Sequence, residues 1–353
     1  MDPKMQAAIF TGEESLHIKE VEVPEIEKRN DVIVETRVCG VCATDVHTYQ
    51  GEFISEKSPY PLIPGHEVSG IVVKTGSKTS QIEEGDKVAI DPFLSTCGEC
   101  YHCQNNRYNH CKEAVTLGTN VAGGFARYIK VPAGSLSVFE KASFSEASLA
   151  EPLATVIYGQ KRAEIDYSDS VLIIGAGPIG LLHLQLANLS GSSETVVVDI
   201  DEKRLAKADE LGADRVIPAS ISPDISSQKK KKILQGTRGG GYEVVIEATG
   251  VPGVVEASPE FLKPGGRLLV FGVAPHKSSI SLNPYEIYRR DYEIIGAFAL
   301  KNTLNKSLRL IDSGKLKLEP VIGESFPLAE IKSALRTVEE GTNSGKVQIE
   351  FND

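Results

Sequence analysis

The stretch that decides the fold is residues 171–180, which reads Val-Leu-Ile-Ile-Gly-Ala-Gly-Pro-Ile-Gly. The four apolar residues predict a buried strand, and an apolar helix is expected to follow as far as Leu189. Between them, Gly175 would allow a tight turn, Gly177 a close approach to a pyrophosphate, and Gly180 close packing of helix on strand. This context predicts a dinucleotide-binding turn with the phosphates at a helix N-terminus. The cofactor-binding residues expected in the turn are Gly175, Gly177, Pro178, Ile179 and Gly180.

An acidic residue ends the next predicted strand. Asp199 follows three valines and lies about 20 residues beyond Gly180, the separation at which such a residue binds the adenosine ribose. A carboxylate there repels a 2′-phosphate, so the sequence favours NAD over NADP. Lys203 and Arg204 lie close by, and an arginine can accommodate that phosphate, so use of NADP is the alternative.

The pattern of the chain changes near residue 145. Residues 5–140 are mostly strand-like, with Gly, Pro and Asn between the strands. One long helix is expected over Ser145–Arg162, and strands then alternate with helices, which predicts an α/β fold with a doubly wound parallel sheet. Two helices and a final strand follow residue 300. We therefore expect a dinucleotide-binding domain, residues 155–296, inserted into a β-rich domain of residues 1–154 and 297–353.

Composition narrows the classes of partner. The chain has 353 residues, of which 38 are Lys or Arg and 48 are Asp or Glu, so its formal net charge is −10. An acidic surface disfavours nucleic acid and leaves a small molecule as the expected partner. No apolar run approaches the roughly 18–20 residues that cross a bilayer, and no secretory signal is evident, so we expect a cytoplasmic protein without a membrane span. The lysine run at 229–232 is expected to be a solvated helix face.

Four cysteines lie within fifteen residues of one another, in the spacing Cys-x2-Cys-x2-Cys-x7-Cys. They are Cys97, Cys100, Cys103 and Cys111. Four thiolates close a tetrahedral zinc site completely, and a closed site holds a loop in shape without reacting with substrate. We therefore expect a structural zinc in a lobe at residues 97–111. The alternatives are free or disulfide-bonded cysteines, or an iron–sulfur cluster, although the spacing differs from the ferredoxin patterns.

Two further segments carry metal-ligand types. One is Cys-Gly-Val-Cys-Ala-Thr-Asp-Val-His at residues 39–47, and the other is Pro-Gly-His-Glu at residues 64–67. Each is ambiguous alone, because a single cysteine is usually buried in a core and Cys-x-x-Cys can also be a redox pair.

Taken together and in this order, these motifs resemble the zinc-dependent medium-chain dehydrogenase/reductase family over nearly the whole chain. The resemblance implies a GroES-like β-rich catalytic domain and a Rossmann domain. It also implies that Cys42 and His66, not Cys39, bind a catalytic zinc, which makes two zinc ions per chain. The third ligand is Glu67 or Glu151, one binding directly and the other through water; a surface carboxylate is the other interpretation of Glu151.

The resemblance also assigns roles in catalysis. Thr44 would take the alcohol proton and His47 would release it to solvent, while Asp45 would support the metal ligands and Thr155 would lie beside the nicotinamide. The implied reaction is hydride transfer from a secondary alcohol to the nicotinamide, as zinc lowers the pKa of the alcohol. By resemblance alone, we expect Tyr49, Phe53, Thr119, Phe298 and Leu300 near the substrate.

The identity of the alcohol is less sharply predicted. The Glu-Pro-Leu and Gly-His-Glu segments resemble polyol dehydrogenases, but an Arg-Tyr pair of sorbitol dehydrogenases is replaced by Ala299-Leu300. We expect oxidation of a polyol such as arabinitol or sorbitol to a ketose. The alternatives are a threonine, butanediol or other secondary-alcohol dehydrogenase, and a cofactor-binding sensor of the same fold. A homo-oligomer, dimer or tetramer, is expected by resemblance.

Overall fold

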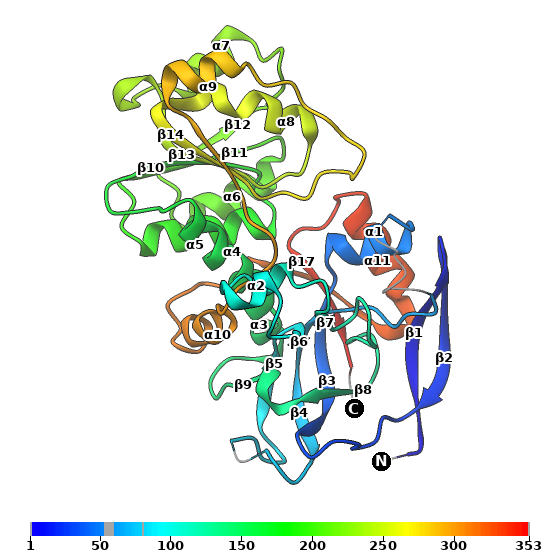
Figure 1. Ribbon diagram of the computed structural model, residues 1–353. Helices are drawn as coiled ribbons and strands as arrows, with labels where there is room; N and C mark the ends of the chain where they lie inside the picture. Colours follow the sequence, from blue (N-terminus) through cyan, green and yellow to red (C-terminus); the bar gives the residue numbers. More distant parts are fainter. Residues whose placement is uncertain (1, 53–59, 80, 352–353) are drawn as a thin grey trace. The chain divides into compact units, whose positions relative to one another are not determined.

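The computed structural model describes residues 2–52, 60–79 and 81–351 (Figure 1). The chain divides into two compact units, and the second interrupts the first. The first unit consists of Met1–Ala154 and Leu300–Asp353, and the second of Thr155–Ala299. Within the described ranges, no helix combines the length and the apolar composition needed to cross a membrane.

The second unit is built on a six-stranded parallel sheet with the order β12-β11-β10-β13-β14-β15. Its strands are β10 (Ser170–Ile174), β11 (Glu194–Asp199), β12 (Arg215–Pro218), β13 (Tyr242–Glu247), β14 (Leu262–Val270) and β15 (Glu293–Gly296). The direction of winding reverses between β10 and β13, the position at which such sheets bind dinucleotides. The doubly wound parallel sheet predicted from the sequence is confirmed.

Helices cover both faces of this sheet. They are α5 (Pro178–Leu189), α6 (Glu202–Glu210), α7 (Ser227–Ile233), α8 (Pro252–Ala257) and α9 (Pro284–Arg290). Figure 1 shows α5 and α6 on one face, and α7, α8 and α9 on the other. Burial on both faces explains the continuous apolar sequence of β10, in which Val171 to Ile174 are all buried.

The first unit contains a seven-stranded sheet with the order β16-β17-β3-β4-β5-β9, and β8 pairs with β3. Its strands are β3 (Asp31–Gly40), β4 (Glu67–Thr75), β5 (Lys87–Ile90), β8 (Tyr128–Pro132), β9 (Leu136–Val138), β16 (Ile322–Pro327) and β17 (Lys346–Glu350). Strand β3 pairs antiparallel with β4, β8 and β17. A strand from the end of the chain therefore completes the sheet that its beginning forms.

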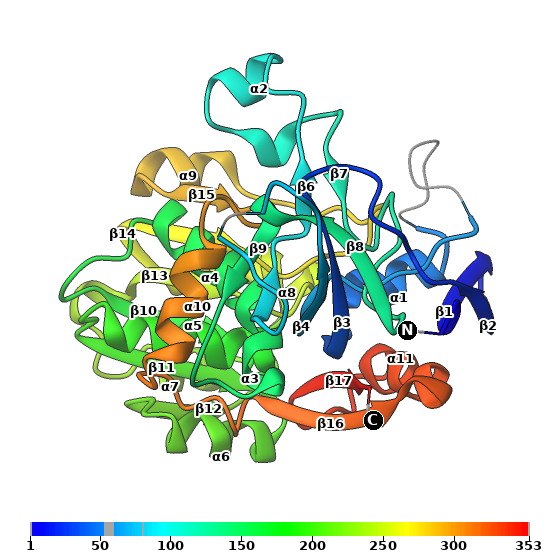
Figure 2. The same ribbon diagram turned by 90° about the horizontal axis from the view of Figure 1, so that it is seen from below.

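Shorter elements surround this sheet. The strands are β1 (Lys4–Gly12), β2 (Ser15–Glu22), β6 (Phe93–Ser95) and β7 (Val115–Thr116). The helices are α1 (Ala43–Tyr49), α2 (Tyr101–Gln104), α3 (Phe144–Ser148), α10 (Leu304–Asp312) and α11 (Ile331–Glu339). Helix α4 (Ala150–Arg162) begins in the first unit and continues into the second. Figure 2 shows that α2 belongs to a lobe that projects from the β-strands of its own unit.

The single helix expected over Ser145–Arg162 is wrong, because the structure has two helices there, α3 and α4. Pro152 explains the break. It has no N–H to donate to the carbonyl of Ser148, and its ring opposes a continuous helix at that carbonyl. The same proline is tolerated in the first turn of α4, where the amides have no helical partner.

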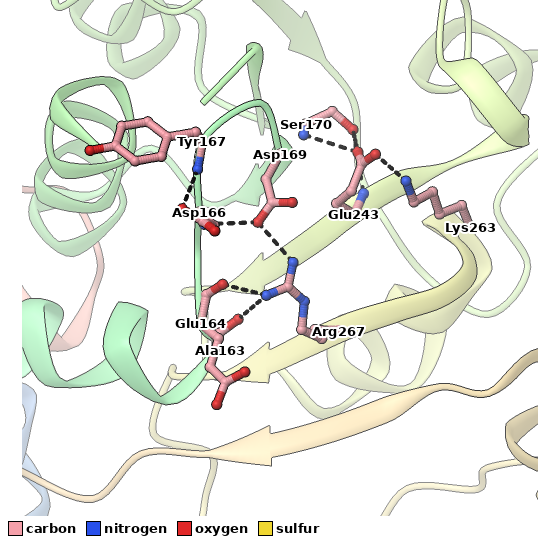
Figure 3. Close-up of polar contacts among 9 residues, drawn as sticks. All are labelled: Ala163, Glu164, Asp166, Tyr167, Asp169, Ser170, Glu243, Lys263 and Arg267. Atoms are coloured by element: carbon pink, nitrogen blue, oxygen red, sulfur yellow. Dashed lines mark hydrogen bonds and ion pairs between the residues drawn. The ribbon is translucent and has the colours of Figure 1, made fainter. Parts of the chain in front are cut away.

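A polar network joins the amino ends of β10, β13 and β14 (Figure 3). Glu243 accepts hydrogen bonds from the Ser170 amide (2.9 Å), the Ser170 hydroxyl and Lys263. Burial raises the pKa of Glu243, but these bonds outweigh it and lower the pKa to about 2. The network lies at the opposite edge of the sheet from the glycine-rich turn, so its role is to hold the strands together.

Arg267 is the second anchor of this edge. Its guanidinium donates to the carbonyl of Ala163 (2.7 Å), the carbonyl of Glu164 and the Asp169 carboxylate (2.7 Å) (Figure 3). One side chain therefore links β14 to the segment that leads into β10.

Replacing Arg267 should destabilise the second unit. We expect Arg267→Met to lower the free energy of unfolding by about 2–4 kcal/mol, because Asp169 and two carbonyls lose a charged donor. The measurement is urea unfolding followed by circular dichroism. Arg336→Met is the matched control, since Arg336 is 76% exposed and bonds only its neighbour Glu340 among the pairs identified in the described chain. Equal unfolding curves for the two variants would contradict the role of Arg267.

Candidate metal and cofactor sites

Three of the expected metal ligands meet in the first unit. Potential ligand atoms of Cys42, His66 and Glu67 all lie within 4.8 Å of one another. The pairing of β3 with β4 brings them together, because Gly40 at the end of β3 is opposite Glu67 at the start of β4. Cys42 then lies in the segment that leaves β3, and His66 in the segment that enters β4.

Asp45 joins these two segments. One carboxylate oxygen accepts a hydrogen bond from the Cys42 amide (2.9 Å), and the other accepts one from the Gly65 amide (3.2 Å). The second oxygen also lies 3.7 Å from Nδ1 of His66. A carboxylate beside a ligating histidine orients the ring and makes it a better ligand. Asp45, the third residue of α1, is buried and thereby supports both ligands.

Glu67 forms a buried ion pair that no motif in the sequence indicates. Its Oε1 accepts a hydrogen bond from Nζ of Lys346 at 2.5 Å, and the side chains are only 2% and 8% exposed. Burial by itself lowers the pKa of Lys346, but the contact with Glu67 and the nearby Cys42 and Glu151 together outweigh it and raise that pKa above its usual range. Among the described residues, the other oxygen, Oε2, has no hydrogen-bond partner.

Glu151 lies in the first turn of α4 and is buried, so it is not a surface carboxylate. It is not part of the group that Cys42, His66 and Glu67 form. Burial, with further contributions from Glu67 and Asp91, raises its pKa to about 7 against the opposing effect of His66 and Lys346. In the described part of the chain, the compact group of donors therefore contains Glu67 and leaves Glu151 outside.

The donor set fits a divalent cation of the zinc type. Thiolate, imidazole and carboxylate are the ligands of catalytic zinc sites with an open fourth position. The partnerless oxygen of Glu67 would gain a partner from the ion. Burial lowers the pKa of His66, but the neighbouring Asp45 carboxylate and the Cys42 thiol outweigh it and raise the pKa. Surroundings that favour a proton on this ring also favour a metal ion in its place.

The two residues expected to move the proton lie on one face of α1. Thr44 and His47 are three residues apart, and the Thr44 hydroxyl lies 3.6 Å from Sγ of Cys42. Nδ1 of His47 lies 2.7 Å from a carboxylate oxygen of Glu52, a partner that carried no motif in the sequence. Of the residues expected near the alcohol, Phe53 lies outside the described residues, and Leu300 is fully buried.

The four cysteines of the lobe form a second group. Their sulfur atoms lie within 4.8 Å of one another, with Cys97 3.8 Å from Cys103 and 3.6 Å from Cys111. Tetrahedral Zn–S bonds place sulfur atoms about 3.8 Å apart, so the spacing fits zinc. Gly98, with φ +75°, allows the turn between the first two cysteines. Amides of Cys100 and Glu99 lower the pKa of the Cys97 thiol to about 7, which favours the ligating thiolate.

The glycine-rich turn lies between β10 and α5. Gly175 has φ +104°, and a Cβ atom on Gly180 would lie 1.8 Å from the Gly175 carbonyl oxygen, so both positions require glycine. Gly177 is the N-cap of α5, and a Cβ atom there would meet nothing within 4 Å. Pro178 and Ile179 form the first turn of α5.

Asp199 ends β11 beside this turn. Its carboxylate accepts hydrogen bonds from the Ala176 amide (2.6 Å) and the Asp201 amide (2.9 Å). Arg204 lies in the first turn of α6, whose N-cap is Asp201. Thr155 lies one turn after Glu151 on α4. The turn, Asp199 and Arg204 thus share the carboxyl edge of the sheet.

Known proteins are similar to this chain along nearly its whole length. Models of the alcohol dehydrogenase GroES-like domain and of zinc-binding dehydrogenases match residues 28–141 and 178–313. The chain is 30% identical over 339 residues to D-arabinitol dehydrogenase 1 of Uromyces fabae, covering 94% of this chain and 93% of the relative. It is 31% identical over 345 residues to the sorbitol dehydrogenase of Bos taurus, covering 96% and 94%.

A solved structure extends the likeness to three dimensions. A zinc-binding dehydrogenase of Sinorhizobium meliloti 1021, bound to NADP, matches with a TM-score of 0.89 and 28% identity over 99% of each chain. The predicted pairing of a GroES-like domain with a Rossmann domain is thereby confirmed. The chain belongs to the zinc-dependent medium-chain dehydrogenase family, is similar to its polyol dehydrogenases, and is an oxidoreductase.

Proposed function

We propose that this protein oxidises a secondary alcohol of a polyol, such as arabinitol or sorbitol, to the ketose with zinc and NAD. The observation that carries the proposal is the meeting of Cys42, His66 and Glu67 in one buried group. When bound, the metal supplies a Lewis acid that lowers the pKa of the alcohol, and the nicotinamide supplies the hydride acceptor.

Within the proposal, each residue of the site has one task. Cys42, His66 and Glu67 would hold the zinc, and Asp45 would orient His66 through the contact described above. Glu151, buried nearby, would act on the metal through water. Cys97, Cys100, Cys103 and Cys111 would hold the structural zinc.

The proton of the alcohol would leave the site through two side chains of α1. The Thr44 hydroxyl, next to Cys42, would accept the alcohol proton and pass it on towards His47. Glu52, which contacts Nδ1, would orient the His47 imidazole. A histidine suits this step because its charge changes near neutral pH.

The preference for NAD rests on Asp199. Each of its oxygens accepts one amide hydrogen bond and has capacity for another, so the carboxylate can still bind a ribose diol. Its negative charge would repel the 2′-phosphate of NADP. Arg204 and the NADP bound to the related structure from Sinorhizobium meliloti make NADP the alternative cofactor.

The choice of a polyol rests on relatives whose names specify arabinitol and sorbitol. Threonine and butanediol stay as alternatives because the Arg-Tyr pair of sorbitol dehydrogenases is absent at Ala299-Leu300. A homo-oligomer and a cytoplasmic location are parts of the proposal that rest on the family resemblance.

A substrate panel tests the reaction. Purified protein should reduce NAD with pentitols or hexitols, faster than with threonine or 2,3-butanediol, in an assay that follows absorbance at the nicotinamide band. Parallel assays with NADP should be slower. Rapid turnover of threonine without turnover of any pentitol or hexitol would overturn the polyol assignment.

Removing one catalytic ligand should separate the two metal sites. Cys42→Ser should abolish turnover and lower the zinc content from about two ions per chain to about one, because the lobe keeps its four thiolates. Cys39→Ala is the matched control: this neighbouring cysteine is buried and lies outside the metal group, so that variant should keep both ions. Metal analysis by inductively coupled plasma mass spectrometry reads the result. Full activity in Cys42→Ser would refute the ligand assignment.

Removing the charge of Asp199 should weaken the preference for NAD over NADP. Asp199→Asn preserves the shape of the side chain and removes its charge, so the ratio of kcat/KM for NAD to that for NADP should fall by about tenfold or more. Asp214→Asn is the control, because Asp214 bonds the amide of Thr195 at the other end of β11. An unchanged ratio in Asp199→Asn would exclude the ribose role of Asp199.

A further inference from the structure

Lys346 is a buried cation that no motif explains. It is the first residue of β17, and the pairing of β17 with β3 brings it to the end of the sheet where Gly40 and Glu67 lie. Its ammonium group is 2.5 Å from Oε1 of Glu67. Both side chains are buried, so each compensates the other for lost hydration, and the position of each depends on the other.

The two carboxylate oxygens of Glu67 have different surroundings. Oε1 accepts the bond from Lys346, and Oε2 is buried without a hydrogen-bond partner among the described residues. An unsatisfied buried carboxylate oxygen is costly, and a cation beside Cys42 and His66 would satisfy it. The arrangement leaves one oxygen ready for a metal ion.

Gly40 makes room for this orientation. A Cβ atom at position 40 would lie 2.0 Å from Oε2 of Glu67 and 3.1 Å from its Cδ. Its φ is outside the left-handed region, so the glycine is needed for space and not for backbone conformation. Any larger residue would push the carboxylate away from this position.

We propose that Lys346 is a positioning residue that selects Glu67, in preference to Glu151, as the carboxylate ligand of the zinc. It fixes Oε1 and leaves Oε2 to face the ion through the space that Gly40 provides. Glu151, which lies outside the compact group, is then left in the outer layer of the site. This inference rests on the proposed function, since it concerns the same metal site.

Zinc release tests the role of Lys346 without any substrate. In Lys346→Met, zinc should leave the catalytic site roughly 10–100-fold faster, the usual effect of losing a group that orients a ligand. The readout is transfer to the chromogenic chelator 4-(2-pyridylazo)resorcinol, with the slower lobe zinc as an internal standard for folding. Lys346→Arg should restore slow release. Lys130→Met is the control, because Lys130 pairs with the exposed Glu27 in the same unit.

Double variants test whether Lys346 determines which carboxylate, Glu67 or Glu151, binds the zinc. In the wild-type background, Glu67→Gln should speed zinc release more than Glu151→Gln does. In the Lys346→Met background the order should reverse, as Glu151 takes over the ligand position. With Co²⁺ in place of zinc, Lys346→Met should also shift the visible absorption bands. Three results together would overturn the proposal. Lys346→Met would release zinc at the wild-type rate, Glu67→Gln would still have the larger effect in that background, and the Co²⁺ absorption bands would not shift.

Gly40→Ala gives an independent test with Lys346 intact. It should speed zinc release because the added methyl group displaces Oε2, whereas Gly134→Ala should not, since a Cβ there would meet nothing within 4 Å. Slow release in Gly40→Ala would also overturn the proposal. A wild-type protein that holds one zinc, in the lobe alone, would refute the proposed function together with this inference. Two ions and an insensitive Lys346→Met would refute this inference alone.

Discussion

The antiparallel pairing of β3 with β4 brings together the three donors of the candidate metal group, Cys42, His66 and Glu67. Because Gly40 is opposite Glu67, the segment that leaves one strand and the segment that enters the other begin at the same end of the sheet. Cys42 and His66 are then neighbours without any further adjustment of the fold. A slip of one residue in this register would turn Glu67 to the other face and separate the donors.

Features whose parts are close in sequence could be predicted from it. The glycine-rich turn and the four-cysteine lobe each lie within about fifteen residues, so their spacing already encodes their geometry. The break between α3 and α4 was also encoded, in Pro152, but the helical pattern on both sides concealed it. The ion pair of Glu67 with Lys346 spans 279 residues, and no local pattern reports such a contact. If Lys346 selects Glu67 as proposed, the choice between Glu67 and Glu151 depends on this same long-range contact.

Buried charges are fully paired at one place in the protein and incompletely paired at another. At the amino edge of the parallel sheet, Glu243, Lys263, Asp169 and Arg267 satisfy one another, as polar groups with a structural role usually do. At the metal group, the described residues leave one oxygen of Glu67 unsatisfied, and the buried carboxylates of Asp45 and Glu151 lie near enough to interact with Glu67. Crowded, incompletely paired acids are typical of sites that bind cations or perform chemistry.

The order of the segments along the chain has a consequence for biosynthesis. The thiol, imidazole and carboxylate of the metal group are made early, whereas Lys346 follows the whole inserted second unit. A nascent chain that stops before β17 exposes the edge of β3 and has no cation for Glu67. The ion pair between Glu67 and Lys346 can therefore form only after the second unit and β17 have been synthesised. If Lys346 positions Glu67 as proposed, zinc would reach its final coordination at this site only after β17 has been synthesised.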